Sequence, residues 1–378
     1  MTAQADRVPR AARPGLRQRL IRLVADPAFQ ARAARVPLLR RLVRREGEAM
    51  FDLVAGFCHS QILLALVRLD IPAQLLDAPA DTATLATRSH VPQDRMIVLL
   101  NGAASLGLLR QSRDLWSLTT RGAALAGVPG LQGMIAHHDV LYRDLTDPVA
   151  FFRGGVETEL AAFWPYVFGA GGATDARVTA TYSALMADSQ RLVAADTIAA
   201  VNWQHSRRVL DVGGGTGAFL TALGQSQPHL HLDLFDLPAV APDAASRFDH
   251  AGLTSRTTIH AGSFRDDLLP CGADTITLVR VLYDHADSTV LTLLRAVHAA
   301  LPPGGRLIVS EPMTGGPALN RAGDAYFALY CMAMRTGRAR SATQIEALLR
   351  QAGFTDPLRH APVARPFITS VLETVRPS

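Results

Sequence analysis

A run of glycines in the second half of the chain has the residue types and spacing of a nucleotide-binding loop. The segment Val209–Phe219 reads Val-Leu-Asp-Val-Gly-Gly-Gly-Thr-Gly-Ala-Phe, so a β-branched run ends and a helical pattern begins across the glycines. Glycine lets a backbone approach a ligand without interference from a Cβ atom. The spacing Gly213-x-Gly215-x-x-Ala218 satisfies the dinucleotide fingerprint, which alone is weak support for any one cofactor.

Two carboxylates beside this loop distinguish between cofactors. Asp211 stands directly before the glycines, where it would repel a pyrophosphate but would suit the ammonium group of S-adenosylmethionine. Asp236 ends the next predicted strand, where a carboxylate can accept both ribose hydroxyls of an adenosine. The alternative for Asp236 is a helix N-cap before Pro238. The pair favours the methyl donor over NAD and therefore disfavours a dehydrogenase.

Alternating strands and helices position these groups. Short apolar runs separated by helical patterns predict an α/β domain built from βαβ units with a mainly parallel sheet. Ligands of such sheets bind at the carboxyl ends of the strands. The predicted strands cover 209–212, 230–236, 257–262, 275–282 and 306–311, and the run FITSVLETV near the C-terminus predicts an antiparallel edge strand.

The first half of the chain has a different character. Residues 1–45 contain twelve arginines and two aspartates, although the whole chain of 378 residues carries a net charge of only +5. Leucines at helical spacing between the arginines indicate a basic amphipathic arm, which would pack on the body or a second subunit, or contact an anionic membrane surface. Residues 46–200 predict an α-helical winged-helix domain with a linker, and 201–378 form the predicted cofactor-binding domain.

A winged helix raises the alternative of a DNA-binding regulator. Its second helix, 92–106, offers only Gln93, Arg95 and Asn101 to bases, with Asp94 among them. DNA readers need basic and amide side chains there, so a dimerisation module without nucleic acid is favoured. The three cysteines have no CxxC spacing, and the adjacent His137 and His138 would point about 100° apart on a helix, so no metal site is expected.

The combined motifs resemble the small-molecule O-methyltransferase family over roughly residues 46–375. That family joins a winged-helix dimerisation domain to a class I, Rossmann-like α/β methyltransferase domain with a mainly parallel seven-stranded sheet. The resemblance therefore implies this fold and a homodimer that uses S-adenosylmethionine. Part of the sequence is similar to a branch of the family that methylates the tertiary hydroxyl at the end of a linear carotenoid. The motifs are DVGGGTG, FDLPAV, LPPGGRLIVSEPM and GRARSATQIEALLRQAGF for the family, and ELAAFWPYVFGA, SFRDDLLP and RVLYDHAD for the branch.

The resemblance also implies which residues contact the donor. They are Gly213, Gly215 and Gly217 at its methionine part, Asp236 and Leu237 at the ribose, Ser263 and Phe264 along the adenine, and Val279 and Arg280 beside the sulfonium and the acceptor. Met186 matches a family methionine that faces the donor.

The chain departs from the family at the catalytic base. Many relatives carry His-Asp-Trp after the fourth strand, with the histidine as general base, whereas this chain has Tyr283, Asp284 and His285. Of the two family acids that flank the histidine, one matches Glu311 and the other aligns with Ala339. The usual base is therefore missing from its usual place.

The chemistry of the acceptor narrows the choice of base. A tertiary alcohol is far too weak an acid to ionise first, so a base must take its proton while the carbon–oxygen bond forms. His285 is the histidine of this loop and is the candidate base, with Tyr283 or Glu311 orienting the hydroxyl. The alternative is that His285 only packs where relatives carry tryptophan.

The sequence thus predicts an O-methyltransferase that acts on a linear carotenoid. Alternatives are an O-methyltransferase for a polyketide or phenolic compound, and the winged-helix regulator. No uninterrupted apolar run approaches the ~18–20 residues of a membrane span, and no secretory signal is evident. A cytoplasmic protein is expected, with peripheral contact to the inner, photosynthetic membrane as a hypothesis.

Overall fold

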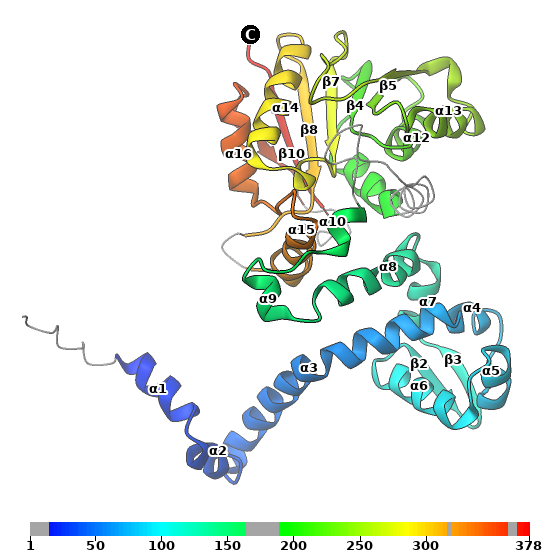
Figure 1. The fold of residues 1–378 in the computed structure, drawn as a ribbon, viewed down its shortest axis with the longest axis vertical. Helices are drawn as coiled ribbons and strands as arrows, with labels where there is room; N and C mark the ends of the chain where they lie inside the picture. Colours follow the sequence, from blue (N-terminus) through cyan, green and yellow to red (C-terminus); the bar gives the residue numbers. More distant parts are fainter. Residues whose placement is uncertain (1–14, 164–188, 316–318, 362–368) are drawn as a thin grey trace, which may run out of the picture. The chain divides into compact units, whose positions relative to one another are not determined.

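The structure, a computed structural model, describes residues 15–163, 189–315, 319–361 and 369–378. The chain divides into two compact units, Met1–Thr119 and Thr120–Ser378, and each contains its own sheet (Figure 1). The candidate site lies entirely in the second unit. Met186 falls outside the described residues.

Three helices open the first unit: α1 (Leu16–Val24), α2 (Pro27–Ala33) and α3 (Pro37–Arg68). Prolines stand in the first turn of α2 and α3, where the missing N–H costs nothing, so they begin helices here. Asp26 caps α2 by accepting hydrogen bonds from the backbone N–H groups of Ala28 and Phe29. Helix α3 runs through residue 46, and the boundaries expected at 45 and 200 stay predictions.

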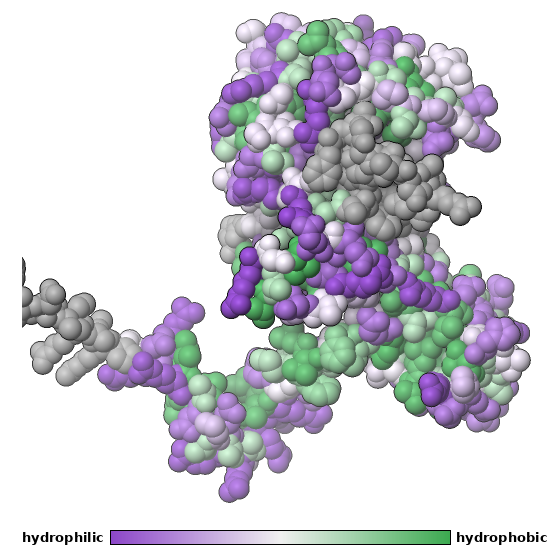
Figure 2. Space-filling view, in the orientation of Figure 1, coloured by the Kyte–Doolittle hydropathy of each residue, from purple (hydrophilic) through white to green (hydrophobic). Residues whose placement is uncertain are grey.

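Helix α3 carries an exposed apolar surface (Figure 2). Met50, Phe51, Leu53, Val54 and Phe57 are all exposed. By length and composition α3 could cross a membrane, although charged residues interrupt the apolar run that the sequence analysis looked for. This is weak support for a span, because a helix that packs against a second copy has the same composition.

The rest of the first unit is the winged helix predicted from the sequence. Helices α4 (Ile71–Gln74), α5 (Thr82–Arg88) and α6 (Gln93–Ser105) precede a hairpin, and the strand order is β1-β3-β2. The strands are β1 (Ala80–Asp81), β2 (Leu109–Ser112) and β3 (Leu115–Leu118). Trp116 on β3 is fully buried, and its indole N–H donates to the Thr82 hydroxyl at 2.9 Å. This bond joins the wing to the helices.

The second unit is built on a seven-stranded sheet in the order β6-β5-β4-β7-β8-β10-β9. The four pairings among β6, β5, β4, β7 and β8 are parallel, and β10 runs antiparallel to both neighbours, which confirms the predicted sheet. One detail was wrong, since β10 is covered by β9 and is not the edge. The strands are β4 (Arg208–Val212), β5 (His231–Asp236), β6 (Thr257–Ala261), β7 (Thr275–Val279), β8 (Arg306–Glu311), β9 (Leu358–Arg359) and β10 (Ser370–Val375).

Helices pack on both faces of this sheet. One core cluster joins the strands to α14 (Asp287–Ala300) and α16 (Ala342–Gln351), and the other joins them to α12 (Ala218–Ser226) and α13 (Ala241–His250). Short 3₁₀ turns, η2 (Thr254–Arg256) and η3 (Leu282–Asp284), connect elements. Because both faces are covered, the ends of the strands are left to bind a ligand.

A helical layer completes the second unit. It contains α7 (Thr120–Gly127), α8 (Leu131–Asp144), α9 (Pro148–Phe152), α10 (Glu159–Phe163), the π-helix η4 (Ala322–Phe327) and α15 (Ala328–Met334). The ring nitrogens of His137 and His138 on α8 bond the hydroxyls of Tyr330 and Tyr326 at 3.1 and 2.8 Å. The two histidines, for which a surface or dimer-contact role is expected, are half-buried and bond to tyrosines of the same unit.

Candidate active site

The glycine loop joins β4 to α12 in the conformation that its sequence demands. Gly213, Gly215 and Gly217 have φ values of 71°, 59° and 75°. Side chains other than glycine rarely adopt this region. The N–H of Gly213 donates to the carbonyl of Phe235 at 2.8 Å, which ties the loop to the end of β5.

Asp211 lies beneath this loop and does not line the pocket. Its Oδ1 accepts a hydrogen bond from the Thr277 hydroxyl at 2.6 Å, and its buried Oδ2 has no partner in the described part of the chain. A Cβ atom at Gly214 would collide with Oδ2. Burial raises the pKa of the Asp211 carboxyl to about 7. The contact with a donor ammonium that the sequence suggested therefore stays a prediction.

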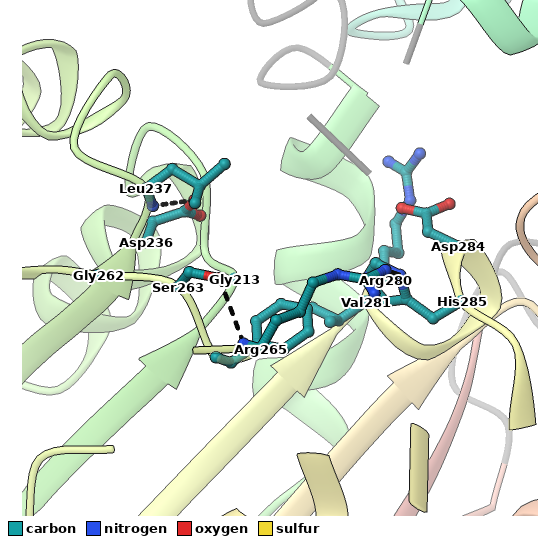
Figure 3. A pocket seen from close by; sticks show the side chains of 11 residues that line it. Gly213, Asp236, Leu237, Gly262, Ser263, Arg265, Arg280, Val281, Asp284 and His285 are labelled. Carbon is teal, nitrogen blue, oxygen red and sulfur yellow. Dashed lines mark hydrogen bonds between the residues drawn. The ribbon is translucent and has the colours of Figure 1, made fainter. Parts of the chain in front are cut away.

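Asp236 closes the other side of the loop. Its Oδ2 accepts from the N–H of Gly215 at 2.6 Å, and its Oδ1 accepts from the N–H of Leu237 at 2.7 Å (Figure 3). Burial raises the pKa of Asp236, while the two N–H groups oppose the rise. Each carboxylate oxygen keeps further acceptor capacity, which suits the two hydroxyls of a ribose.

A pocket opens between the ends of β4, β5, β6 and β7 (Figure 3). It is lined by Gly213, Asp236, Leu237, Gly262, Ser263, Phe264, Arg265, Arg280, Val281, Asp284 and His285. Seven of these were expected from the sequence, and Gly262, Arg265, Val281 and Asp284 were not. The signal for Asp284 was its place in the Tyr-Asp-His run. Of the other expected residues, Asp211, Gly215, Gly217, Val279, Tyr283 and Glu311 do not line this pocket.

The loop after β7 is held from one side by Glu311. The buried carboxylate of Glu311, at the end of β8, accepts hydrogen bonds from three successive N–H groups, those of Val281, Leu282 and Tyr283, at 2.8, 2.7 and 3.2 Å. Burial raises its pKa to about 7. Glu311 therefore positions the loop.

Arg340 holds the same loop from the other side. Its buried guanidinium donates to the carbonyls of Leu282 and His285 at 2.7 and 2.6 Å and to the carboxylate of Asp287 at 2.8 Å. A Cβ atom at Gly337 would collide with the carbonyl of Tyr283, so the chain packs directly on the loop. The residues that replace the usual catalytic ones are thus rigidly placed.

Both aromatic residues of the loop contact arginines. The buried Tyr283 hydroxyl accepts from the Arg280 guanidinium at 3.4 Å, and burial raises its pKa further above the usual value. His285 Nδ1 accepts from Arg265 at 3.2 Å, since arginine can only donate. Burial and the charges of Arg265 and Arg340 lower the pKa of His285 to about 4.

Comparison with known proteins supports one family. An O-methyltransferase domain matches residues 142–355, and an O-methyltransferase dimerisation domain matches residues 51–127. The chain is 54% identical to demethylspheroidene O-methyltransferase of Cereibacter sphaeroides over 96% of both chains. It is also 54% identical to the enzyme of that name from Rhodobacter capsulatus, over 90% of this chain and 85% of the relative.

A solved structure agrees. The S-adenosylmethionine-dependent methyltransferase SibL superposes with a TM-score of 0.72 at 26% identity, covering 87% of this chain and 99% of that one. The cradle of Asp236 and the close-packed glycines fits an adenosine carried on such a donor, which supplies a methyl group on a positive sulfur. The chain therefore belongs to the O-methyltransferase family, as a dimer-forming enzyme that depends on S-adenosylmethionine.

Proposed function

We propose that this enzyme transfers a methyl group from S-adenosylmethionine to the tertiary 1-hydroxyl of a linear carotenoid of the demethylspheroidene or hydroxyneurosporene type. The observation that carries the proposal is the 54% identity, over 96% of both chains, to a relative named for that reaction. The changed base position is consistent with an alcohol acceptor, because a phenol would profit from a base that ionises it beforehand.

Donor binding would use the residues around the pocket. We assign Asp236 and Leu237 to the ribose, Ser263 and Phe264 to the adenine, and Arg280 to the side of the reacting methyl group. Gly213, Gly215 and Gly217 would carry the methionine part, and Val279 would act only through the loop that follows it, because its own side chain is buried in the core.

The test is a transfer assay with defined acceptors. The purified protein, in detergent micelles, is incubated with methyl-labelled S-adenosylmethionine and either a 1-hydroxylated linear carotenoid or a panel of phenols and polyketides. Label in a methoxy-carotenoid is the expected result. Label found only in a phenol or polyketide would instead support the alternative, an O-methyltransferase for a polyketide or phenolic compound. Donor binding by calorimetry without any label would retain the donor site and remove both acceptor classes.

A DNA-binding regulator is disfavoured by the surface of α6. Asp94 is exposed beside Gln93 and Arg95 at the start of that helix, so its charge would oppose a phosphate backbone. Salt-dependent binding to duplex DNA at micromolar protein would revive this alternative.

The carotenoid substrate gives the basic arm a role at a membrane. Leu16, Leu20 and Ile21 on α1 are exposed, and Arg17, Arg19 and Arg22 alternate with them. Each arginine near an anionic surface would contribute about 1 kcal/mol. We propose that the protein is cytoplasmic and docks peripherally on the inner membrane through α1. The apolar residues of α3 from Phe51 onward lie in the matched dimerisation domain, so we assign them to the second copy.

Liposome sedimentation tests the membrane contact. We expect the full chain to sediment with phosphatidylglycerol vesicles, and a variant with Arg17, Arg19 and Arg22 changed to glutamine to stay in solution. An equal number of changes at Arg295, Arg350 and Arg376, outside the arm, is the matched control. Equal sedimentation of the arm variant and the full chain would exclude the arm as the docking element.

A further inference from the structure

Asp284 lines the pocket and has a buried carboxyl oxygen without a hydrogen-bond partner in the described part of the chain. The residue lies in η3, lines the pocket with Val281 and His285, and projects away from the sheet (Figure 3). Its side chain is buried, and Oδ1 has no hydrogen-bond partner in the part of the chain that the structure describes. A buried polar atom without a partner costs about 1–3 kcal/mol, so such an atom in a pocket wall calls for a ligand.

The residues around Asp284 hold the backbone on both sides of it. Glu311 takes the N–H groups of the three preceding residues, and Arg340 takes the carbonyls of Leu282 and His285 on either side. Gly337 packs directly against the carbonyl of Tyr283. The backbone on both sides of Asp284 is thus held in place by groups from β8 and from the segment before α16.

His285, the other candidate in the loop, has its basic atom occupied. Nδ1 accepts from Arg265, so in the neutral ring Nε2 carries the hydrogen and has no lone pair for a proton. Phe264 contacts the ring edge-to-face, with centroids 5.2 Å apart, and fixes its orientation. To act as a base, His285 would have to release Arg265 and become a buried cation between Arg265 and Arg340.

We propose that Asp284, rather than His285, takes the proton of the acceptor hydroxyl during methyl transfer. The inference rests on the proposed transfer to an alcohol. The acceptor oxygen forms a bond to the methyl carbon, and the carbon–sulfur bond breaks with its electron pair going to sulfur. The hydroxyl proton passes to Oδ1 of the Asp284 carboxylate. A buried positive sulfur and a buried carboxylate are both neutral afterwards, which favours the step where water is excluded.

The charges that face Asp284 set its ionisation. Glu311 on β8 and burial raise the pKa of Asp284 well above its usual value, whereas Arg280 and the Tyr283 hydroxyl oppose the rise. Cys331 on α15 and Arg340 are further titratable or charged groups close to this cluster, and Arg265 and His285 line the same pocket. A carboxyl with a raised pKa is a stronger base once ionised, and a positive sulfur in the same pocket would favour its ionised form. Donor binding should therefore release protons from Asp284.

The experiment compares Asp284→Asn with His285→Gln and the surface control Asp266→Asn. Donor binding is measured by calorimetry at pH 7 in two buffers of different ionisation enthalpy, which yields the protons released for each donor bound. Turnover is measured with the acceptor that the wild type methylates. The wild type and every variant contain the same buried carboxyl groups of Asp211, Asp236 and Glu311. The proton release of each variant is therefore compared with that of the wild type, and only the difference is interpreted.

We expect Asp284→Asn to bind the donor, to release fewer protons than wild type and to lose at least about 10²-fold in kcat, the usual contribution of a general base. His285→Gln and Asp266→Asn should lose far less. Unchanged proton release in Asp284→Asn, or turnover close to that of wild type, would overturn the assignment. If the wild type methylates no carotenoid, the proposed acceptor fails, whereas the difference in proton release still decides the role of Asp284.

Discussion

Replacing Asp211 by asparagine should change how the stability of the protein depends on pH. The carboxyl is fully buried, and among the described residues only the Thr277 hydroxyl is its hydrogen-bond partner. Burial raises its pKa from 3.8 to about 7. A carboxyl that binds its proton more tightly when folded lowers the free energy of unfolding as pH rises between the two pKa values. Asparagine keeps an oxygen for Thr277 and has no charge to bury.

The size of the effect follows from the two pKa values. At about 1.4 kcal/mol for each unit of pKa, ionisation of Asp211 above pH 7 costs the folded protein about 4 kcal/mol relative to the unfolded chain. Roughly 2.5 kcal/mol of this cost arises between pH 5 and pH 7.5. At pH values well below 3.8 the carboxyl is protonated in both states, and the cost vanishes.

The assay is urea unfolding of the protein without donor, followed by circular dichroism at pH 5 and pH 7.5. The free energy of unfolding of Asp211→Asn minus that of wild type should rise by about 2.5 kcal/mol from pH 5 to pH 7.5. A change in packing would add the same amount at both pH values. Asp243→Asn, an exposed change on α13, should follow the wild type. If the free energies of unfolding of Asp211→Asn and wild type changed equally with pH, the reasoning that burial, and not the loop backbone, sets the pKa of this carboxyl would be refuted.

Three further changes test the same site. Gly214→Ala should lower stability by about 1–3 kcal/mol and weaken donor binding, because its Cβ would collide with Asp211 and lie 2.7 Å from Leu234 Cδ1; equal melting temperature and affinity would contradict this packing. Glu311→Ala leaves three buried N–H groups without an acceptor, at about 1–3 kcal/mol each, so it should unfold at much lower urea than Glu311→Gln, and similar midpoints would show that water replaces the carboxylate. Asp236→Ala should weaken donor binding at least about tenfold, as expected when roughly 1.4 kcal/mol of hydrogen bonding is lost, and calorimetry showing wild-type affinity would exclude a ribose contact.

The parts of the site that are local in sequence could be predicted. The Gly213–Gly217 loop adopts the positive φ angles that only its glycines tolerate, and Asp236 lies at the carboxyl end of β5 beside it. The strand expected over 275–282 was too long, because Arg280 turns the chain with a φ of 58° and β7 ends at Val279. Apolar periodicity continues past that turn, since Val281 and Leu282 are buried in the core without being in a strand.

The sequence by itself determined the fold class, the glycine loop and the carboxylates near it, because strand patterns, glycine conformations and strand ends depend on neighbouring residues. Only the tertiary structure decided what each charged group does. Glu311 and Arg340 bond to the backbone of the loop after β7, although they lie about 30 and 60 positions further along the chain. Arg265 donates a hydrogen bond to Nδ1 of His285. Burial, which no local pattern measures, places Asp211 beneath the loop, whereas Asp284 and Asp236 line the pocket.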